Sequence, residues 1–526
     1  MQRVALVGAA AFLVGLQAIA AAAGQAAATP TPKTCSEAEA WKLGWPMIHG
    51  PDGNFNPLRI GAPLVSDLKD ARKIWESEYR DIGVGKCGDR PRGVVKSLND
   101  PLMHQGGFGS PILADGTIFV AHYRPSGSVL FPHEGEAAAF PAGACTVAAD
   151  DVVAAMDART GKTRWVAVQK DKGVNIQMGK RGGWGVTPAY LDGRVFAVGT
   201  TGRLYALDAA TGRTVWESDV GKAHAAMEAA KKEALAEKKI VAGKIAWNAS
   251  LMVAGGVLVV PVYGGHDLAL RGLAPADGKV LWEVPAASAG TATPALVRLE
   301  GREYVLAATN AGMMRLIEPA TGKVLWTVEG LGANRRTLTP DGGYVIVNTT
   351  ARQKPEYGRL GCFRLTTGGA DKVWEMPDRP EFGDAYWPDG GAHRHGLLRD
   401  GLAYMVFGAK RPRGQSTVEA DAGYAVVRLA TGEILFHRQI DRMGMPYLVE
   451  DRLLYFGDLC HHPAWGKWWL ISADPSAAPV LPQEGAAFDH LLTSGYEVQL
   501  EFPIVAGRIF MRTLQGRIAC YDLRAR

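Results

Sequence analysis

The sequence lacks the short motifs that identify common enzyme classes. It has no Gly-x-Ser-x-Gly nucleophile elbow, no phosphate-binding Gly-Lys loop and no His-Glu-x-x-His zinc motif. Strong net charge is lacking too, because 58 basic and 53 acidic residues leave +5 over 526 residues. No run of Lys or Arg concentrates that charge. These absences argue against the usual hydrolase and nucleotide-binding sites, and against a nucleic-acid-binding protein.

Long apolar runs are also missing, except at the N-terminus. Residues 4–20 are almost wholly apolar, Arg3 is the only charge before Lys33, and several Ala-x-Ala cleavage choices lie within residues 18–28. This pattern predicts a secretory signal peptide over residues 1–28, with an uncleaved anchor as the alternative. Its removal takes away one Arg and lowers the net charge from +5 to +4. We therefore expect an exported protein, periplasmic or secreted, with no stable membrane span after cleavage.

Cysteine is scarce, and its spacing is uninformative. The six cysteines of the chain could form up to three disulfides in an exported protein, and six cysteines allow 15 pairings. Cys35 and Cys87 lie in irregular sequence near the N-terminus, so they are the better disulfide candidates. Cys362 and Cys520 lie in apolar, strand-like runs and could equally be buried thiols.

A segment of about ten residues recurs along the chain and is the strongest pattern in the sequence. Its clearest copies carry Asp157, Gly161 and Trp165; Asp208, Gly212 and Trp216; Gly278 and Trp282; and Gly322 and Trp326. Looser copies end at Trp374 and Phe436, and successive aromatic ends are 44 to 66 residues apart. A period of this length indicates a propeller or a solenoid. Each copy predicts a strand, a tight turn in which Asp accepts backbone N–H groups and Gly supplies a left-handed conformation, and a second strand carrying Trp.

A second hairpin precedes each copy. Ser110 to Val120 matches Thr187 to Ala197, with Asp-Gly between two apolar runs in both, which is a strong hairpin signal. Related hairpins begin near Leu251, Pro294, Pro340, Gly396, Pro446 and Pro503. Two hairpins per repeat predict four-stranded antiparallel blades, so we expect an all-β, eight-bladed β-propeller. Residues 442–490 fit the repeat poorly, which leaves seven blades as the alternative.

The last repeat stops after its third strand, at residues 517–526. The missing outer strand occurs at the other end of the chain, where residues 71–77 around Trp75 resemble residues 214–218. We therefore expect Trp75 to complete the final blade and close the ring.

The repeat Ala-x-Asp-x-x-Thr-Gly-Lys-x-x-Trp resembles the tryptophan-docking repeat of pyrroloquinoline-quinone-like (PQQ-like) propellers. The resemblance covers residues 65–526, after an irregular segment over residues 29–64; residues 222–244, rich in Ala, Lys and Glu, predict a helical insertion. The family contains quinone-dependent alcohol dehydrogenases, and also non-enzymatic members such as the propeller subunit of the outer-membrane protein assembly machinery. The enzymes share an adjacent Cys-Cys pair and a calcium-and-base motif, and neither can be matched in this sequence. A Cys-x-x-Cys-His haem site is absent as well, so no catalytic residue is carried over.

Aligning the blades places several aromatic and basic residues at one position facing the central channel. Trp184, Trp247, Arg336 and Arg442 would offer ring faces and guanidinium groups to a planar or anionic ligand. The alternative is that these side chains plug the channel or pair with nearby acids.

Histidines cluster twice. His393 and His395 alternate and would share one face of a strand, and His461 and His462 follow Cys460 directly. They are weak metal candidates, because neither run has an established ligand spacing; ordinary hydrogen-bonded histidines are the alternative. Trp465, Trp468 and Trp469 could form a carbohydrate- or partner-facing patch, with packing beneath a loop as the alternative.

These observations favour a binding protein over an enzyme. We predict an exported propeller that acts as a protein-interaction scaffold or as a receptor for a small ligand. The alternative is a divergent PQQ-dependent dehydrogenase, using PQQ with calcium, whose site involves Trp184, Trp247, Arg336 and the His393/His395 pair.

Overall fold

The repeated hairpins fold into antiparallel sheets in a computed structural model. The structure describes residues 34–82, 106–107, 109–132, 145–174, 177–178, 181–182, 185–220, 249–262, 267–289, 292–334, 337–349, 360–376, 396–408, 422–440, 446–456, 467–476, 485–488, 500–513 and 515–526. Residues 34–526 form one unit, separate from residues 1–33. The predicted signal peptide and the helical insertion over residues 222–244 lie outside the described residues.

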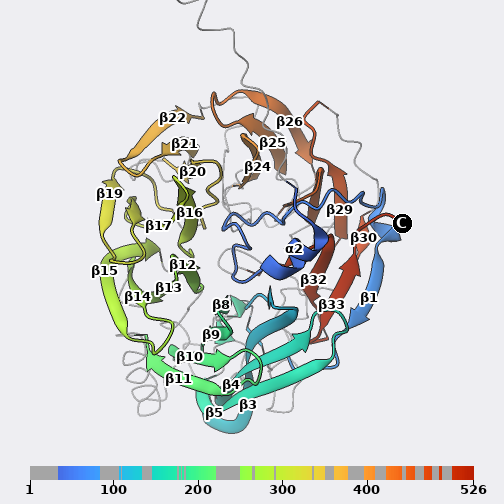
Figure 1. Ribbon diagram of the computed structural model, residues 1–526, viewed down its shortest axis with the longest axis vertical. Coiled ribbons are helices and arrows are strands. Elements are labelled where there is room, and N and C mark those ends of the chain that lie inside the picture. Colours follow the sequence, from blue (N-terminus) through green and yellow to red (C-terminus); the bar gives the residue numbers. More distant parts are fainter. Residues whose placement is uncertain are drawn as a thin grey trace, which may run out of the picture. The chain divides into compact units, whose positions relative to one another are not determined.

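Eight sheets form the blades of a ring (Figure 1). The first four blades are β2 (Ile112–Ala114), β3 (Thr117–Pro132), β4 (Cys145–Asp157) and β5 (Thr163–Val174); β8 (Ala189–Leu191), β9 (Arg194–Val198), β10 (Arg203–Asp208) and β11 (Thr214–Asp219); β12 (Met252–Ala254), β13 (Val257–Val262), β14 (Asp267–Leu273) and β15 (Val280–Ala289); and β16 (Ala295–Leu299), β17 (Arg302–Ala308), β18 (Met314–Ile317) and β19 (Val324–Val328). The remaining blades are β20 (Tyr344–Asn348), β21 (Leu360–Leu365) and β22 (Ala370–Glu375); β23 (Gly396–Arg399), β24 (Leu402–Gly408), β25 (Ala422–Arg428) and β26 (Ile434–Ile440); β27 (Tyr447–Val449), β28 (Arg452–Phe456), β29 (Lys467–Ser472) and β30 (Ala486–Ala487); and β31 (Ile504–Val505), β32 (Arg508–Arg512) and β33 (Ile518–Asp522) with β1 (Arg72–Glu76).

The eight-bladed prediction is confirmed. In the fifth blade the inner position is held by an isolated bridge between Asp341 and Tyr344 instead of a full strand. The poorly fitting region near residues 442–490 is the seventh blade, whose outer strand β30 has only two residues. A short hairpin, β6 (Gln177–Met178) with β7 (Arg181–Gly182), lies outside the blades.

Closure of the ring by the N-terminal strand is confirmed as well. Strand β1 is antiparallel to β33 and occupies the outer position of the eighth blade, with Trp75 opposite Cys520. The two ends of the propeller are thus joined by sheet hydrogen bonds.

Tryptophan docking joins neighbouring blades as the repeat predicts. Asp208 Oδ1 accepts hydrogen bonds from the N–H and the hydroxyl of Thr211 in the tight turn, and Gly212 has a left-handed φ of 74°. A Cβ at Gly212 would lie 2.5 Å from the ring of Trp165. Glycine is therefore required for two reasons, the backbone conformation and the close approach of the preceding blade's indole.

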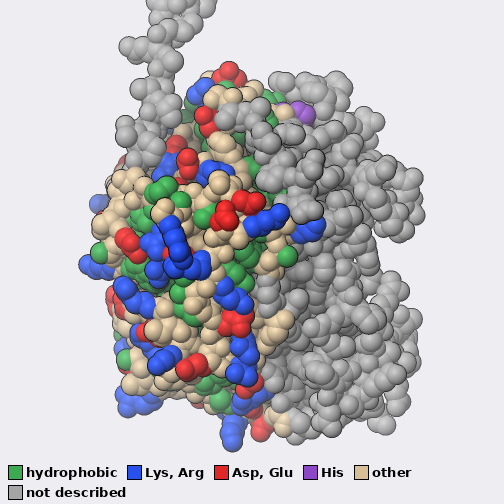
Figure 2. Space-filling view, turned by 90° about the vertical axis from the view of Figure 1, so that its right-hand side faces the viewer, with side chains coloured by type: hydrophobic (Ala, Val, Ile, Leu, Met, Phe, Trp, Pro, Cys, Tyr) green, Lys and Arg blue, Asp and Glu red, His purple; other side chains and the backbone are tan. Residues whose placement is uncertain are grey.

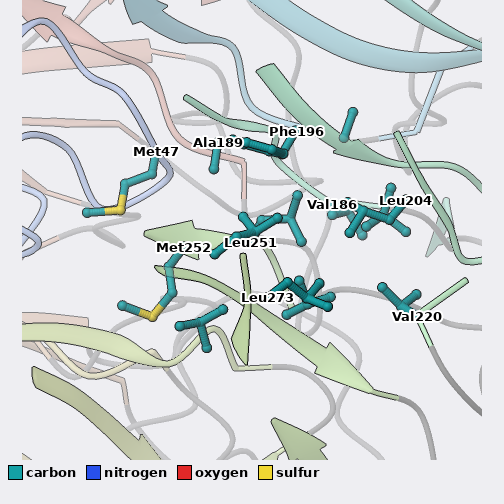
Figure 3. Close-up of a cluster of buried hydrophobic side chains, with 14 of the residues drawn as sticks. Met47, Val186, Ala189, Phe196, Leu204, Val220, Leu251, Met252 and Leu273 are labelled. Atoms are coloured by element: carbon teal, nitrogen blue, oxygen red, sulfur yellow. The ribbon is translucent and has the colours of Figure 1, made fainter. Parts of the chain in front are cut away.

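The core lies between the blades, where the faces of adjacent sheets meet. One cluster spans the first four blades and includes Phe196, Leu251 and Met252, together with Met47 from the N-terminal segment. Figure 3 shows these side chains converging. Acidic and basic side chains are interspersed over the described surface (Figure 2). Among the described residues, no helix is long and apolar enough to cross a membrane.

Candidate functional site

All of the predicted site residues lie outside the described residues. They are Trp184, Trp247, Arg336, Arg442, His393, His395, His461 and His462. They remain predictions. The described residues nevertheless show how the neighbouring chain is held. Trp184 is three residues before Thr187, Trp247 is three residues before Ser250, and Arg336 directly precedes Thr337.

A belt of buried hydroxyl groups links the inner strands of neighbouring blades. Its members are Ser110, Thr187, Ser250, Thr293 and Thr337, each at most 2 % exposed. Each hydroxyl oxygen accepts the backbone N–H of the equivalent residue in the preceding blade, at 2.7–3.2 Å. The belt therefore runs from the eighth blade to the fifth and fixes the inner strands against one another. Only three of the five belt residues are followed by proline in the sequence, whereas Ser250 and Thr337 are followed by leucine. The Ser-Pro and Thr-Pro pairs are therefore too incomplete a signal to reveal the belt.

In the eighth blade, the residue equivalent to the belt hydroxyls is Glu501, so a carboxyl group replaces the hydroxyl. This carboxyl is 1 % exposed, and its Oε2 accepts a hydrogen bond of 2.9 Å from the hydroxyl of Tyr447 in the seventh blade. The Tyr447 oxygen in turn accepts the N–H of Phe502 at 3.2 Å. Sequence reasoning missed this pair, because nothing in the repeat indicates that a carboxylate replaces a hydroxyl there.

The N-terminal segment, residues 34–70, covers the end of the ring at which the first hairpin of each blade turns. It begins with helix α2 (Glu37–Leu43), capped by the Ser36 side chain, which accepts the N–H of Glu39, and it ends with η1 (Leu68–Asp70). The helix falls within the stretch expected to be irregular. Figure 1 shows this segment inside the ring.

The N-terminal segment is hydrogen-bonded or ion-paired to seven of the blades, and it shares an apolar cluster with the third. In the first four blades, Trp45 N–H donates to Leu113 O, Tyr190 N–H donates to Pro46 O, Met47 shares a cluster with Met252, and Arg298 pairs with Asp52. In the last four blades, the side-chain amides of Asn54 and Asn56 donate to Asp341 and to Leu398 O, the Ile60 N–H donates to the Glu450 carboxylate, and the Val65 N–H donates to Leu523 O. A ligand reaching the ring is therefore expected at the opposite end, where the connections leading into the inner strands lie.

A group of buried polar side chains lies where the eighth blade meets the first. The ring of His122 is 1 % exposed, and its Nε2 lies 3.0 Å from the hydroxyl of Tyr79. Burial, with the nearby Arg512 charge, lowers the pKa of His122 to about 3, and burial raises the pKa of Tyr79 above its ordinary value. Arg512 donates to the main-chain oxygens of Gly109 and Ile82 at 2.8 and 3.2 Å. His122 and Tyr79 therefore stay neutral near pH 7, so the arrangement suits structural cohesion more than proton transfer.

Asp151 joins the first blade to the second. Its carboxylate accepts hydrogen bonds from the N–H and the hydroxyl of Thr200 at 2.9 and 3.0 Å and from the Tyr205 hydroxyl at 3.1 Å. Gly199 gives the carboxylate its space, because a Cβ there would lie 2.0 Å from Oδ2. The adjoining pocket, lined by Ala121, Gln169 and Tyr205 among others, has room for about one water molecule. It is too small for an organic cofactor.

Of the two interpretations of the tryptophan run, buried packing is confirmed for Trp468. This side chain is fully buried and packs between Tyr447 and Phe502, at ring-centroid distances of 6.5 and 5.9 Å. Trp469 is partly buried and stacks on Tyr455 at 5.3 Å. Both rings serve the contacts of the seventh blade, and Trp465 lies outside the described residues.

Cysteine behaves as free thiol wherever the structure describes its side chain. Cys362 and Cys520 are buried thiols, as one of the two interpretations held. Cys35 is a free thiol too, so its selection as a disulfide candidate is wrong; Cys87 lies outside the described residues. Burial and the neighbouring Glu39 and Glu450 carboxylates raise the pKa of Cys35, which keeps it in the less reactive thiol form.

The described residues hold no group of three or more His, Cys, Asp or Glu side chains placed to bind a metal ion. No calcium site can therefore be assigned within the part of the chain that the structure covers.

Comparison with known proteins confirms the resemblance to the PQQ-like propeller family. Residues 149–392, somewhat less than half of the chain, match the PQQ-like family model described as "Outer membrane protein assembly factor BamB". Comparison with curated proteins finds no significant match.

Two solved structures illustrate the likeness in fold. Quinohemoprotein alcohol dehydrogenase from Comamonas testosteroni is 12 % identical, with a TM-score of 0.51 over 92 % of this chain and 81 % of that one. BamB from Moraxella catarrhalis is 14 % identical, with a TM-score of 0.46 over 71 % of this chain and 93 % of that one. At these identities the likeness concerns the fold alone, which enzymes and assembly factors share.

Proposed function

We propose that this chain is an exported β-propeller that acts by binding, as a scaffold for a protein partner. The observation that carries the proposal is the match of residues 149–392 to an outer-membrane assembly factor. The interlocked ring supports it, because tryptophan docking, the hydroxyl belt and the N-terminal segment fix each blade against its neighbours. A rigid frame holds its connecting loops in place, and this lowers the entropy lost when a partner binds.

The partner is expected on the end of the ring opposite the N-terminal segment. That segment is buried against the hairpin turns, with Trp45 and Ile48 fully inaccessible to solvent. The predicted residues Trp184, Trp247 and Arg336 come one to three positions before described belt residues that lead into the inner strands, and Arg442 is predicted to occupy the equivalent position. Aromatic and guanidinium side chains of this kind dominate the binding energy at protein interfaces.

The alternative function is a PQQ-dependent oxidoreductase, favoured by the likeness in fold to an alcohol dehydrogenase. PQQ with calcium would supply the redox chemistry in such an enzyme. The described residues supply no calcium ligand set, and no adjacent cysteine pair occurs in the chain. We therefore assign no catalytic step to any residue.

Site-specific photo-crosslinking in the producing cell tests the scaffold. A photoreactive amino acid replaces Trp184 or Arg442 in separate variants. The matched control is Glu300, an exposed residue two positions after Arg298, which pairs with Asp52 of the N-terminal segment. One discrete protein adduct from the Trp184 and Arg442 positions, absent at Glu300, supports the proposal. No adduct from either loop position contradicts it.

Titration of the purified protein with PQQ plus calcium, followed by tryptophan fluorescence, tests the alternative. Saturable quenching near one equivalent that is lost in Trp247→Ala would favour the oxidoreductase. Absence of quenching at micromolar quinone would remove the alternative without affecting the crosslinking result.

A further inference from the structure

In the second to sixth blades, a main-chain carbonyl one or two residues after the third strand accepts the indole N–H of the docking tryptophan. Trp165 donates its indole N–H to Ala209 O at 3.0 Å, and Trp374 donates to Leu429 O at 2.8 Å. Trp216 and Trp282 bind the equivalent carbonyls of Pro275 and Pro319, and Trp326 binds Thr366 O, one residue further on. The second to sixth blades are therefore each docked by the tryptophan of the blade before.

The equivalent carbonyls of the seventh and eighth blades receive other donors. Ala473 O, in the seventh blade, accepts the hydroxyl of Tyr404 at 3.0 Å. The sixth blade has Phe436 where its tryptophan would stand, and phenylalanine has no N–H to donate. Leu523 O, in the eighth blade, accepts the backbone N–H of Val65 at 2.9 Å. At both joints of the seventh blade, with the sixth and with the eighth, another donor therefore replaces the indole N–H.

The stretch Arg59–Leu68 of the N-terminal segment contacts the sixth, seventh and eighth blades, the same part of the ring. The Glu450 carboxylate, at the first turn of the seventh blade and 9 % exposed, accepts the N–H groups of Ile60 and Gly61 at 2.9 and 3.0 Å. Arg59 donates to Glu450 O at 3.2 Å and pairs with Asp400 of the sixth blade at 2.5 Å.

Two further contacts extend this stretch over the seventh and eighth blades. Pro63 O accepts the N–H of Ala525 at 2.8 Å. Leu68 is 3 % exposed and lies in one cluster with Trp468 and Leu470 of β29. A single stretch of ten residues therefore spans the sixth, seventh and eighth blades.

We propose that Arg59–Leu68 is a clamp that, together with Tyr404, replaces tryptophan docking on both sides of the seventh blade, and that this blade opens first when the clamp is loosened. At the seventh and eighth blades, a donor from Tyr404 or from the clamp takes the carbonyl that a tryptophan binds elsewhere. The outer strand β30 pairs with β29 only at Lys467 and Trp468. The seventh blade then depends on contacts with residues nearly 400 positions away, whereas the second to fourth blades are held by their own repeats.

Hydrogen exchange of the full-length protein, followed by mass spectrometry of peptides, tests this proposal. In the unmodified protein, amides of β28 and β29 are expected to exchange faster than those of β9 and β17, because they open with a lower free energy. The Glu450→Gln and Arg59→Ala variants each remove a charged partner of the clamp. Each is expected to speed exchange in β28 and β29 about tenfold, which is the effect of losing one charge-assisted hydrogen bond.

Arg298→Ala is the matched control. Arg298 pairs with Asp52 of the same N-terminal segment at 2.8 Å, but it lies on the fourth blade, which tryptophan docks on both sides. It is expected to leave exchange in β28 and β29 unchanged. Equal acceleration around the whole ring in the clamp variants, no change in β28 and β29, or slower exchange there than in β9 in the unmodified protein would each overturn the proposal.

Discussion

The pH dependence of stability at Asp341 tests the contact between the N-terminal segment and the fifth blade. The partly buried carboxyl of Asp341 lies at the first turn of the fifth blade, and its Oδ1 accepts a hydrogen bond of 2.9 Å from the side-chain amide of Asn54. Burial raises the pKa of Asp341 from 3.8 to about 6, and the charges of Asp400 and Asp52 add to the rise. The hydrogen bond from Asn54 and the charge of Arg399 lower this pKa, but only in part.

The sign of the pH dependence follows from this pKa. A carboxyl whose pKa is higher in the folded state binds its proton more tightly there than in the unfolded chain. Its contribution to stability is therefore complete below the ordinary value of 3.8 and is lost as the pH rises to about 6. This rise would correspond to about 3 kcal/mol for a fully buried group. Partial exposure of the side chain reduces the expected effect to about 1–2 kcal/mol.

Asp341→Asn keeps the shape of the side chain and its acceptor oxygen but cannot ionise. We expect this variant to match the wild type near pH 4 and to be more stable by about 1–2 kcal/mol at pH 7.5. Urea unfolding followed by tryptophan fluorescence at the two pH values measures the difference.

Asp400→Asn is the matched control, since Asp400 also lies at the first turn of its blade, the sixth. Its carboxylate lies 2.5 Å from Arg59, so its replacement is expected to destabilise the protein at pH 7.5. A lower stability of Asp341→Asn at pH 7.5, or an advantage that does not change with pH, would refute the reasoning.

Three further substitutions test the joints between blades, each by thermal or urea unfolding. Trp216→Phe removes the indole donor to Pro275 O and is expected to cost about 1–2 kcal/mol; an unchanged stability would mean that docking is apolar packing alone. Gly212→Ala forces a Cβ to 2.5 Å from the Trp165 ring at a φ of 74°, with an expected loss of roughly 3 kcal/mol. Thr187→Val leaves a buried N–H of the preceding blade without its acceptor, for a loss of about 1–3 kcal/mol, and a neutral result would remove the belt from the list of stabilising contacts.

The repeat made most of the fold predictable. A turn that needs Asp and Gly, followed four residues later by Trp, occurs at intervals that only a stacked architecture explains, and the isolated copy at Trp75 identified the closing strand. The prediction was weakest where the repeat is weakest. In the seventh blade the docking donor is Tyr404 from a different strand, and no local pattern predicts a substitution made from elsewhere in the chain.

The candidate site was less predictable than the fold. Aligning the blades suggested which residues approach the channel, but the belt hydroxyls and Glu501 were recognisable only once neighbouring blades were brought together. Trp468 also shows that the sequence could not decide its role. An aromatic run in irregular sequence is compatible both with a binding surface and with buried packing.

What the sequence by itself determined is the local structure: which residues form strands, which turns connect them, and how many blades they make. Periodicity and turn chemistry act over a few residues, so they can be read without knowing what packs against what. Only the tertiary structure decided how the ring is held. The path of the N-terminal segment over all eight blades, the burial that raises the pKa of Asp341, and the donors that replace tryptophan around the seventh blade all join residues far apart in the chain. Their positions follow from the packing of whole sheets, which no local pattern encodes.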